Sequence, residues 1–250
     1  MNKSLLFTII ILLSIACKEN NDNIESYSFD FKPRKCNIVS LLSMKQTATE
    51  YNGITYFEYL SIEENTKIKS SIYVIGIWAA NGFDRFVIDD PIPSLEKEIS
   101  IDYEKYLNKS YLPSKSNLLQ DTDFELATTI HEIEYRLDGI VNFNISSLDA
   151  PLFSKPIGSS LNQYFEIFKY NPDFIASYDS KRLLYGYTDK EKPNAIDEWL
   201  SLRPMAQSSM YVRLKSIPDN LPVTLRFKVD METTNGIIVS DTTDVVTLSN

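Results

Sequence analysis

The residues that most often perform catalysis are few in this 250-residue chain. His131 is the single histidine, and it lies in the strand-like run Thr129–Ile133. A Ser-His or Cys-His pair needs a histidine base beside its nucleophile, and the Gly-x-Ser-x-Gly motif is absent from the sequence. One histidine and two cysteines also leave too few ligands for a usual zinc site. We therefore expect no catalytic residue, no metal site and no cofactor, and a strand-face position for His131.

Carboxylates are the remaining groups with catalytic potential, because glycoside hydrolysis needs only two well-placed acids. The 34 acidic residues include the adjacent pair Asp89 and Asp90 and the alternating pair Glu132 and Glu134, but no spacing singles out one pair. Residues 121–125 (DTDFE) begin like a calcium loop and lack its glycine and its later bidentate glutamate. We interpret them as a loop, and a carboxylate-dependent hydrolase is the second alternative function.

Two tryptophans, Trp78 and Trp199, could form with neighbouring tyrosines a platform on which sugar rings stack. Trp78 ends the most apolar run of the chain, Ile72–Trp78, and Trp199 lies on the apolar side of a predicted short helix. Large aromatic side chains in such positions belong more often to a core. We interpret both as core residues and keep them as ligand-stacking candidates, so that a surface glycan-binding module is the first alternative function.

Residues 1–16 have the composition of a secretory signal peptide. Lys3 gives a positive start, and residues 4–15 are almost wholly apolar, a run shorter than the ~20 residues of a membrane-spanning helix. The small residues Ser14 and Ala16 come just before Cys17. The alternative interpretation is a plain signal peptide with a cysteine nearby by chance.

The stretch Leu13–Cys17 resembles the lipobox of bacterial lipoproteins, in which the chain is cut before the cysteine and the cysteine is acylated. Two or three acyl chains imply near-permanent membrane attachment. Residues 17–26, with the polar run KENNDNIES, then form a predicted disordered tether that extends to about 30 Å. Lys18 takes the place of the aspartate that marks inner-membrane retention in this family. The resemblance therefore implies an outer-membrane anchor at Cys17, facing the periplasm or the cell surface.

The charge balance excludes one class of partner. Without residues 1–16 the chain has 24 basic and 34 acidic residues and a net charge of −10, whereas nucleic acids are bound by basic surfaces. With Cys17 acylated, Cys36 has no partner for an intrachain disulfide. Arg34 and Lys35 could lower the pKa of the Cys36 thiol, but a small buried residue at the first strand is the interpretation that its apolar neighbours favour.

Alternation of apolar and polar residues dominates residues 27–250 and predicts strands. The run Ile72–Trp78 is expected to be a central strand buried on both faces, and residues 71–88 to be a hairpin. Residues 98–103 and 132–137 alternate as well, with Ile133, Tyr135 and Leu137 on one face. After Gly139, one more inward-facing set is expected, formed by Val141, Phe143 and Ile145.

The C-terminal part carries the clearest strand pattern. Met210, Val212 and Leu214 alternate with polar residues, and the run Val223–Val229 alternates again after the turn at residues 218–222. Thr233–Gly236 contains Asn-Gly and predicts a hairpin turn. Residues 237–239 and 245–248 are expected to complete a meander. The predicted fold is mostly β, with one or more antiparallel β-sandwich-like domains and a soft boundary near residues 151–158.

Two short connecting helices are expected between the strands. The first is capped by Ser159 or Ser160, and its apolar face consists of Leu161, Tyr164, Phe165 and Phe168. The second is capped by Asn194, with acids in its first turn that suit the helix dipole. Its inward-facing residues are Ile196, Trp199 and Leu200.

Two stretches, DAPLFSKPIGSSLNQYFEI at residues 149–167 and RFKVDMETTNGIIVSDTTDVVTL at residues 226–248, resemble a pattern in uncharacterised Bacteroidetes-type lipoproteins. In these a lipobox precedes a mostly β domain that ends in a hairpin. The resemblance implies a location and a fold class, and DTT at 241–243 resembles their short O-glycosylation motif. We expect a lipid-anchored envelope protein with a non-catalytic binding or assembly role. Its partners would be the membrane, through Cys17, and an envelope protein or glycan.

Replacing Cys17 by serine tests the anchor. The acyl chains attach through the cysteine thiol, so the Cys17→Ser chain is expected in the aqueous fraction or unprocessed, whereas the unaltered chain partitions with membranes. Detergent phase separation and mass spectrometry of the N-terminus measure the two properties. A Cys17→Ser chain that still enters the detergent phase contradicts the lipid anchor.

Overall fold

The computed structural model describes residues 28–80, 130–180, 182–185 and 192–250. It confirms the mostly β fold, and α3 is the one α-helix within these ranges. In chain order the elements are β1 (Ser28–Arg34), β2 (Ile38–Tyr51), β3 (Ile54–Ser61), β4 (Thr66–Lys69), η1 (Ser70–Ile72), β5 (Tyr73–Ala80), β6 (Ile130–Arg136), β7 (Ile140–Ser147), η3 (Asn162–Tyr164), β8 (Phe165–Asn171), β9 (Ile175–Ala176), β10 (Leu183–Tyr185), α3 (Ile196–Ser201), β11 (Ser209–Leu214), β12 (Val223–Leu225), β13 (Phe227–Thr233), β14 (Ile238–Thr242) and β15 (Val246–Ser249).

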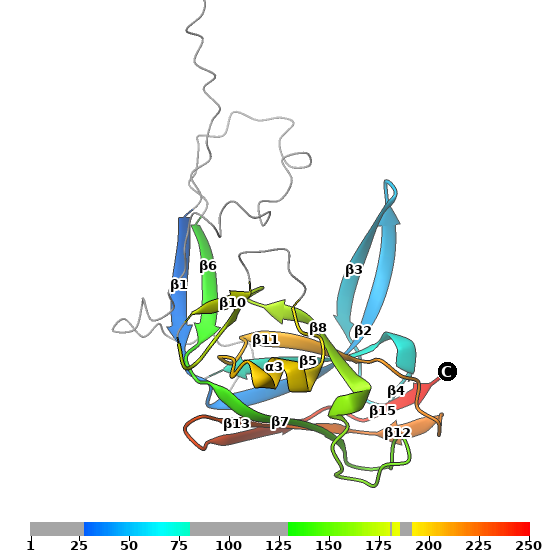
Figure 1. Cartoon of the computed structure of the whole chain (residues 1–250). Coiled ribbons are helices and arrows are strands. Elements are labelled where there is room, and N and C mark those ends of the chain that lie inside the picture. Colours follow the sequence, from blue (N-terminus) through cyan, green and yellow to red (C-terminus); the bar gives the residue numbers. More distant parts are fainter. Residues whose placement is uncertain (1–27, 81–129, 181, 186–191) are drawn as a thin grey trace, which may run out of the picture.

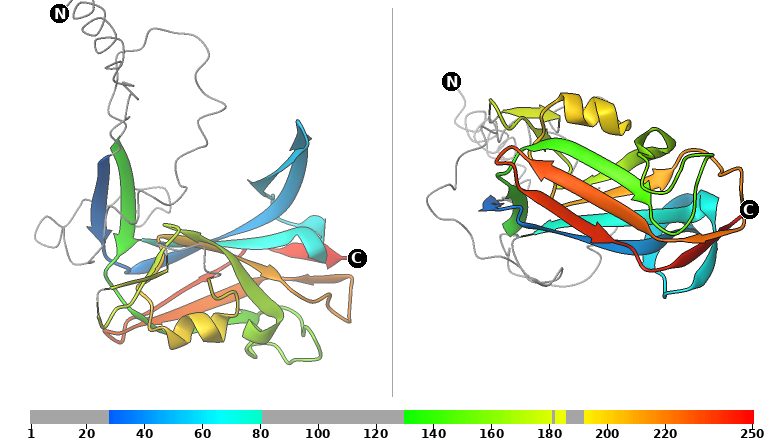
Figure 2. Two further views of the ribbon diagram at one scale, coloured as in Figure 1. Left: turned by 45° about the horizontal axis from the view of Figure 1, so that its top comes forward. Right: turned by 90° about the horizontal axis from the view of Figure 1, so that it is seen from below.

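Most strands form two layers (Figure 1), and β1 with β6 and β9 with β10 form two further two-stranded sheets. The upper layer is an antiparallel five-stranded sheet in the order β3-β2-β5-β11-β8. The lower layer consists of two three-stranded sheets, in the orders β14-β13-β7 and β12-β15-β4. Seen from below, β7, β13 and β14 lie side by side across this layer (Figure 2, right). The arrangement is a β-sandwich, in which each layer buries one face against the other.

The core lies between the layers and is centred on aromatic rings. The Phe227 ring stacks on Tyr73 at a centroid distance of 5.6 Å and meets the edge of Phe165 at 5.4 Å. All three side chains are fully buried. Phe227 belongs to the lower layer and the other two to the upper layer, so these contacts join the two sheets. The predicted inward faces of residues 210–214 and 223–229 are confirmed, because their alternate apolar side chains are buried.

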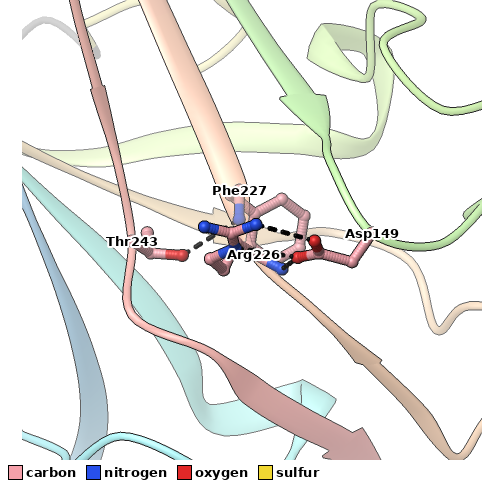
Figure 3. Close-up of polar contacts among 4 residues, drawn as sticks. All are labelled: Asp149, Arg226, Phe227 and Thr243. Atoms are coloured by element: carbon pink, nitrogen blue, oxygen red, sulfur yellow. Dashed lines mark hydrogen bonds and ion pairs between the residues drawn. The ribbon is translucent and has the colours of Figure 1, made fainter.

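The four C-terminal strands form one long hairpin that is interrupted at its middle. β12 pairs with β15, and β13 pairs with β14, in nearly the same register. At the interruption Phe227 donates its N–H to Thr243 Oγ1 at 2.9 Å, and the Thr243 N–H donates to the Phe227 carbonyl at 2.8 Å. Figure 3 shows Thr243 facing Phe227 here. The predicted Asn-Gly turn is confirmed at Gly236, which has a φ of +76°.

Arg226, the residue at the interruption, is bonded to Asp149 in the segment that follows β7. Its backbone N–H and its Nε both donate to Asp149 Oδ2, at 2.8 and 3.0 Å, and a terminal nitrogen donates to Oδ1 at 2.8 Å (Figure 3). The hydrogen bonds from Arg226 hold the pKa of the Asp149 carboxyl below its usual value. Asp149 therefore continues the contact between the chain after β7 and the residue before β13, and it stabilises the bend of the hairpin.

One strand connection differs from the prediction. The C-terminal meander is wrong in its last step, because β15 pairs with β12 and β4 and has no pairing with β14. β5, the first strand of the hairpin predicted over residues 71–88, is paired with β2 and β11. β5 itself is the predicted central strand, and Tyr73–Ile77 are buried on both faces. Residues 83–88 and 98–103 lie outside the described residues.

The inward position of Val141 is wrong. Ile140 is 1% exposed and Val141 is 45% exposed, while Phe143 and Ile145 face the core as expected. In the pairing of β7 with β13, Ile140 lies opposite Thr233 and Asn142 opposite Glu232, with a register shift between them. The shift is a bulge that adds one residue and reverses the side-chain alternation.

The helix predicted from Ser159 or Ser160 is wrong for most of its length. Only Asn162–Tyr164 form a 3-10 turn, and Phe165–Asn171 form β8 at the edge of the upper sheet. Phe165 and Ile167 face the core, and Phe168 lies on the outer side at a register shift against β11. Pairing with β11 thus outweighs the helical spacing of the aromatic residues.

The second predicted helix is confirmed as α3, with Ile196 and Trp199 buried and Leu200 packed against the core. Its N-cap is Ala195, without a side-chain hydrogen bond, and the predicted cap at Asn194 is wrong. Trp199 meets Phe143 of β7 edge-on at 5.8 Å. The helix contacts β7 and β8, which are edge strands of the two layers, so it closes the open side of the sandwich.

β2 and β3 extend beyond the upper sheet as a two-stranded arm. The pairing of β2 with β5 ends at Lys45, whereas the pairing of β2 with β3 continues from Met44 to Tyr51. We call residues 46–59 the arm. Figure 1 shows it rising from the sheet, and on the same side of the sandwich β1 pairs in parallel with β6 (Figures 1 and 2).

Removal of the Thr243 hydroxyl is expected to destabilise the fold. Thr243 is 2% exposed, so Thr243→Val leaves the buried Phe227 N–H without its acceptor at a cost of about 1–3 kcal/mol. Thr243→Ser keeps the hydroxyl and is expected to cost clearly less. Urea unfolding followed by tryptophan fluorescence measures both free energies, and equal losses in the two variants would contradict the role of the hydrogen bond.

Candidate functional site: an aromatic cluster on the outer sheet face

The outer face of the upper sheet is organised around Gly76 in β5. A Cβ atom on Gly76 would lie 2.4 and 2.5 Å from two carbons of the Trp78 indole and 2.9 Å from the sulfur of Met44. The missing side chain therefore leaves the space in which the six-membered ring of Trp78 lies against the sheet. Tyr211 is directly opposite Gly76 in the sheet register, and its ring meets Trp78 edge-on at 5.8 Å.

Four half-buried rings form what we call the aromatic cluster: Tyr59, Trp78, Phe168 and Tyr211. Tyr59 lies 5.4 Å from Phe168 and 5.6 Å from Tyr211, and Phe168 lies 6.3 Å from Tyr211. The rings come from β3, β5, β8 and β11. Tyr59 belongs to the arm, so the cluster also supports the arm at its base. Burial raises the pKa of the Tyr59 hydroxyl.

Two cations lie over the rings. Lys169 Nζ is 5.3 Å from the Tyr59 centroid and 5.1 Å from the Tyr211 centroid, and the Arg213 guanidinium is 5.1 Å from the Phe168 centroid. Such contacts contribute about 0.5–1 kcal/mol each at exposed positions. Arg213 Nε also donates to Glu166 Oε1 at 2.6 Å. The cluster therefore combines apolar ring surface with hydrogen-bond donors that face solvent.

An open cavity of about 320 Å³ borders the cluster at Arg213. Its other polar side chains include Ser70, Glu166 and Lys215. The cavity thus places hydroxyl, carboxylate and ammonium groups beside the rings.

A second cavity of about 580 Å³ lies beside α3 and is lined by two acids, Glu166 and Glu198. The Glu166 carboxylate already holds Arg213, and Glu198 is exposed. Of the two acids on this cavity, one is therefore held in an ion pair and the other lies on the exposed side of α3. Lys192 on the wall of this cavity pairs with Asp173. Burial raises the pKa of Asp173 to about 6 and lowers that of Lys192 to about 8.

The two predicted tryptophan candidates have different environments. Trp199, on the inner side of α3, is completely buried, as expected for a core residue. The core interpretation of Trp78 is wrong, because its ring lies half-buried on the outer sheet face and outside the core cluster. No local pattern of residues indicated Tyr59, Phe168 and Tyr211 as its neighbours. Alternation in β11 could have placed Tyr211 outward, but the partners of that face depend on strand order.

Cys36 is a buried residue of the connection between β1 and β2, as expected. Burial, with a smaller effect of Asp138, raises the pKa of its thiol to about 12. The alternative of a thiol activated by basic neighbours is therefore wrong. The Cys36 N–H donates to Asp138 Oδ2 at 2.6 Å, and Asp138 Oδ1 accepts from Asn235 Nδ2.

Within the described residues, the remaining candidates form no common site. His131 lies in β6, opposite Phe29 of β1, while residues 89–90 and 121–125 lie outside the described residues. In the DTT motif, Asp241 Oδ2 accepts the Leu41 N–H at 2.7 Å and Thr243 is buried, so two of its three residues have structural contacts. Within the described ranges no three His, Cys, Asp or Glu side chains gather to hold a metal ion.

Comparisons with protein-family models, curated proteins and solved structures gave no match to this chain. In the described part of the chain, α3 and the 3-10 turns are too short for a membrane span, and no helix there meets the length and apolarity that one requires.

Adding a methyl group at Gly76 is expected to displace Trp78. Gly76→Ala should cost about 1–3 kcal/mol of the free energy of unfolding, as overpacking does, and should weaken the near-ultraviolet circular dichroism of the cluster. The cost is expected to fall in a Trp78→Ala background, because the two closest contacts are with the indole ring and the contact that remains is with the flexible Met44 side chain. Urea unfolding of the two single variants and the double variant gives the coupling. An equal cost in both backgrounds would show that the indole is not the obstacle.

Proposed function

We propose that this protein is a lipid-anchored envelope lipoprotein with a non-catalytic binding role, and that the aromatic cluster is its contact surface for a protein partner. Acylation of Cys17 would hold it at the outer membrane, as the lipobox resemblance implies. The observation that carries the binding role is the gathering of four half-buried rings on the outer face of a sheet whose inner face already forms the core.

The composition of this face supports a protein partner. Tyrosine, tryptophan, phenylalanine, methionine and arginine are enriched at protein interfaces, and tryptophan, tyrosine and arginine dominate their hot spots. The face contains Trp78, Tyr211 and Arg213, and the Met44 sulfur lies beside Gly76. A partner that covers the rings would desolvate them further without any rearrangement of the rigid sheet.

A glycan is the second candidate, and Trp78 favours it. The indole lies against Gly76, so it is held in one orientation, as a sugar-stacking ring must be. The neighbouring cavity supplies Ser70, Glu166 and Lys215 for hydrogen bonds to hydroxyl groups. Protein and glycan thus share the same rings and differ in how much of the surrounding face they would cover.

Affinity capture of the acylated chain from its own membranes tests the proposal. A reproducible protein partner is expected, and its recovery should fall at least tenfold with Phe168→Ala or Tyr211→Ala, since truncating one hot-spot ring removes about 2 kcal/mol or more. Ile238→Ala is the matched control, because Ile238 is a 66% exposed apolar residue of the other layer.

Circular dichroism and urea unfolding of each variant establish that the fold is retained. No reproducible partner, or a partner whose recovery ignores both ring variants, contradicts the protein-binding proposal. Binding of purified envelope polysaccharide that is lost with the same two variants would support the glycan candidate instead.

A further inference from the structure

The tip of the arm is the most apolar exposed surface of the described residues. Tyr51, Ile54 and Phe57 are 67%, 52% and 57% exposed, and Tyr56 is 43% exposed. Residues 51–57 (YNGITYF) contain no charged side chain. Exposed apolar surface of this density marks a site of contact.

The tip is apolar on both of its faces. Successive side chains of a strand point to opposite faces, so Ile54 and Tyr56 lie on one face of β3 and Phe57 lies on the other. Beyond Lys45 the arm has only two strands, and nothing in the described residues covers either face. A protein surface would cover one face only, whereas a liquid-like apolar medium surrounds both.

The tip and the start of β1 lie on the same side of the sandwich. β1 begins at Ser28, and Figure 1 shows that β1 and the arm both project from the side of the upper layer. Ten residues separate Cys17 from Ser28 and span at most about 35 Å. An acyl anchor on Cys17 would therefore keep this side of the sandwich within that reach of a bilayer.

We propose that the tip of the arm, residues 51–57, inserts into the interfacial region of the bilayer to which Cys17 is anchored. The inference rests on the proposed lipid anchor and adds a second contact to it. Tyrosine rings favour the headgroup level of a bilayer, and the apolar residues Ile54 and Phe57 reach deeper. Because the anchor raises the local concentration of lipid, a weak insertion suffices.

The negative charge of the chain disfavours an electrostatic contact with anionic lipids. Acidic residues outnumber basic ones by 9 over the whole chain, and Glu50 and Glu58 flank the tip. Attraction to an anionic lipid surface requires clustered lysine or arginine. The insertion is therefore apolar, strongest on zwitterionic phosphatidylcholine vesicles and insensitive to salt.

The test places a fluorescent label at the tip. Ile54→Cys in the acylated chain is labelled with an environment-sensitive dye and added to phosphatidylcholine vesicles that carry a lipid-bound quencher. Cys36 is fully buried and stays unlabelled, and Ile238→Cys in the other layer is the matched control. The label at position 54 is expected to shift to the blue and to be quenched, and the label at position 238 to remain in water.

A second measurement separates this inference from the anchor. In the Cys17→Ser chain the tip is the only proposed membrane contact, and Ile54→Asp should lower its partition into excess vesicles roughly tenfold, whereas Ile238→Asp should not. Acylated protein that floats with vesicles while the label at 54 stays in water overturns the insertion. If the acylated chain fails to float, the anchor is wrong, and the effect of Ile54→Asp then decides the insertion alone. Dimers or a protein partner that shield position 54 without vesicles also overturn it.

Discussion

The sandwich depends on the contacts that Phe227 makes at the interruption of the C-terminal hairpin. Its ring joins the two layers through Tyr73 and Phe165, and its backbone exchanges hydrogen bonds with Thr243. The four strands of this interrupted hairpin thereby belong to two three-stranded sheets. The hydrogen bonds between Arg226 and Asp149 stabilise the bend between them. Without these polar contacts the bend would leave buried backbone groups unpaired, at a cost of about 1–3 kcal/mol for each group.

The outer face of the upper sheet has an organisation of its own. Gly76 has no side chain, and the ring of Trp78, two residues further along the same strand, fills the space above it. The rings of Tyr211, Phe168 and Tyr59 then continue from that point to the base of the arm. The same contacts therefore form the proposed binding surface and hold the arm in position.

Local alternation predicted β5, β6, β7 and the strands from β11 to β15, because burial of one face imposes a period of two wherever a sheet covers a core. The alternation failed as a guide where strand pairing includes a bulge or where another spacing fits the same residues. The bulge at Val141 reverses the alternation, and the spacing of Tyr164, Phe165 and Phe168 suits a helix as well as an edge strand. The aromatic cluster was beyond reach, since it joins residues of four strands whose order no local pattern encodes. Trp78 was singled out for its type, but its outward position depends on Gly76.

The chain runs from β1 directly into β2, and β2 continues without interruption into the arm. Cys36, between the two strands, is tied to Asp138, and the first half of β2 is bonded to β5. A force applied to β1 would therefore reach the upper sheet through residues 35–37 and β2, which is hydrogen-bonded to β5 over its first half. The same strand continues into the arm, so a displacement of β2 would move the tip of the arm together with the upper sheet.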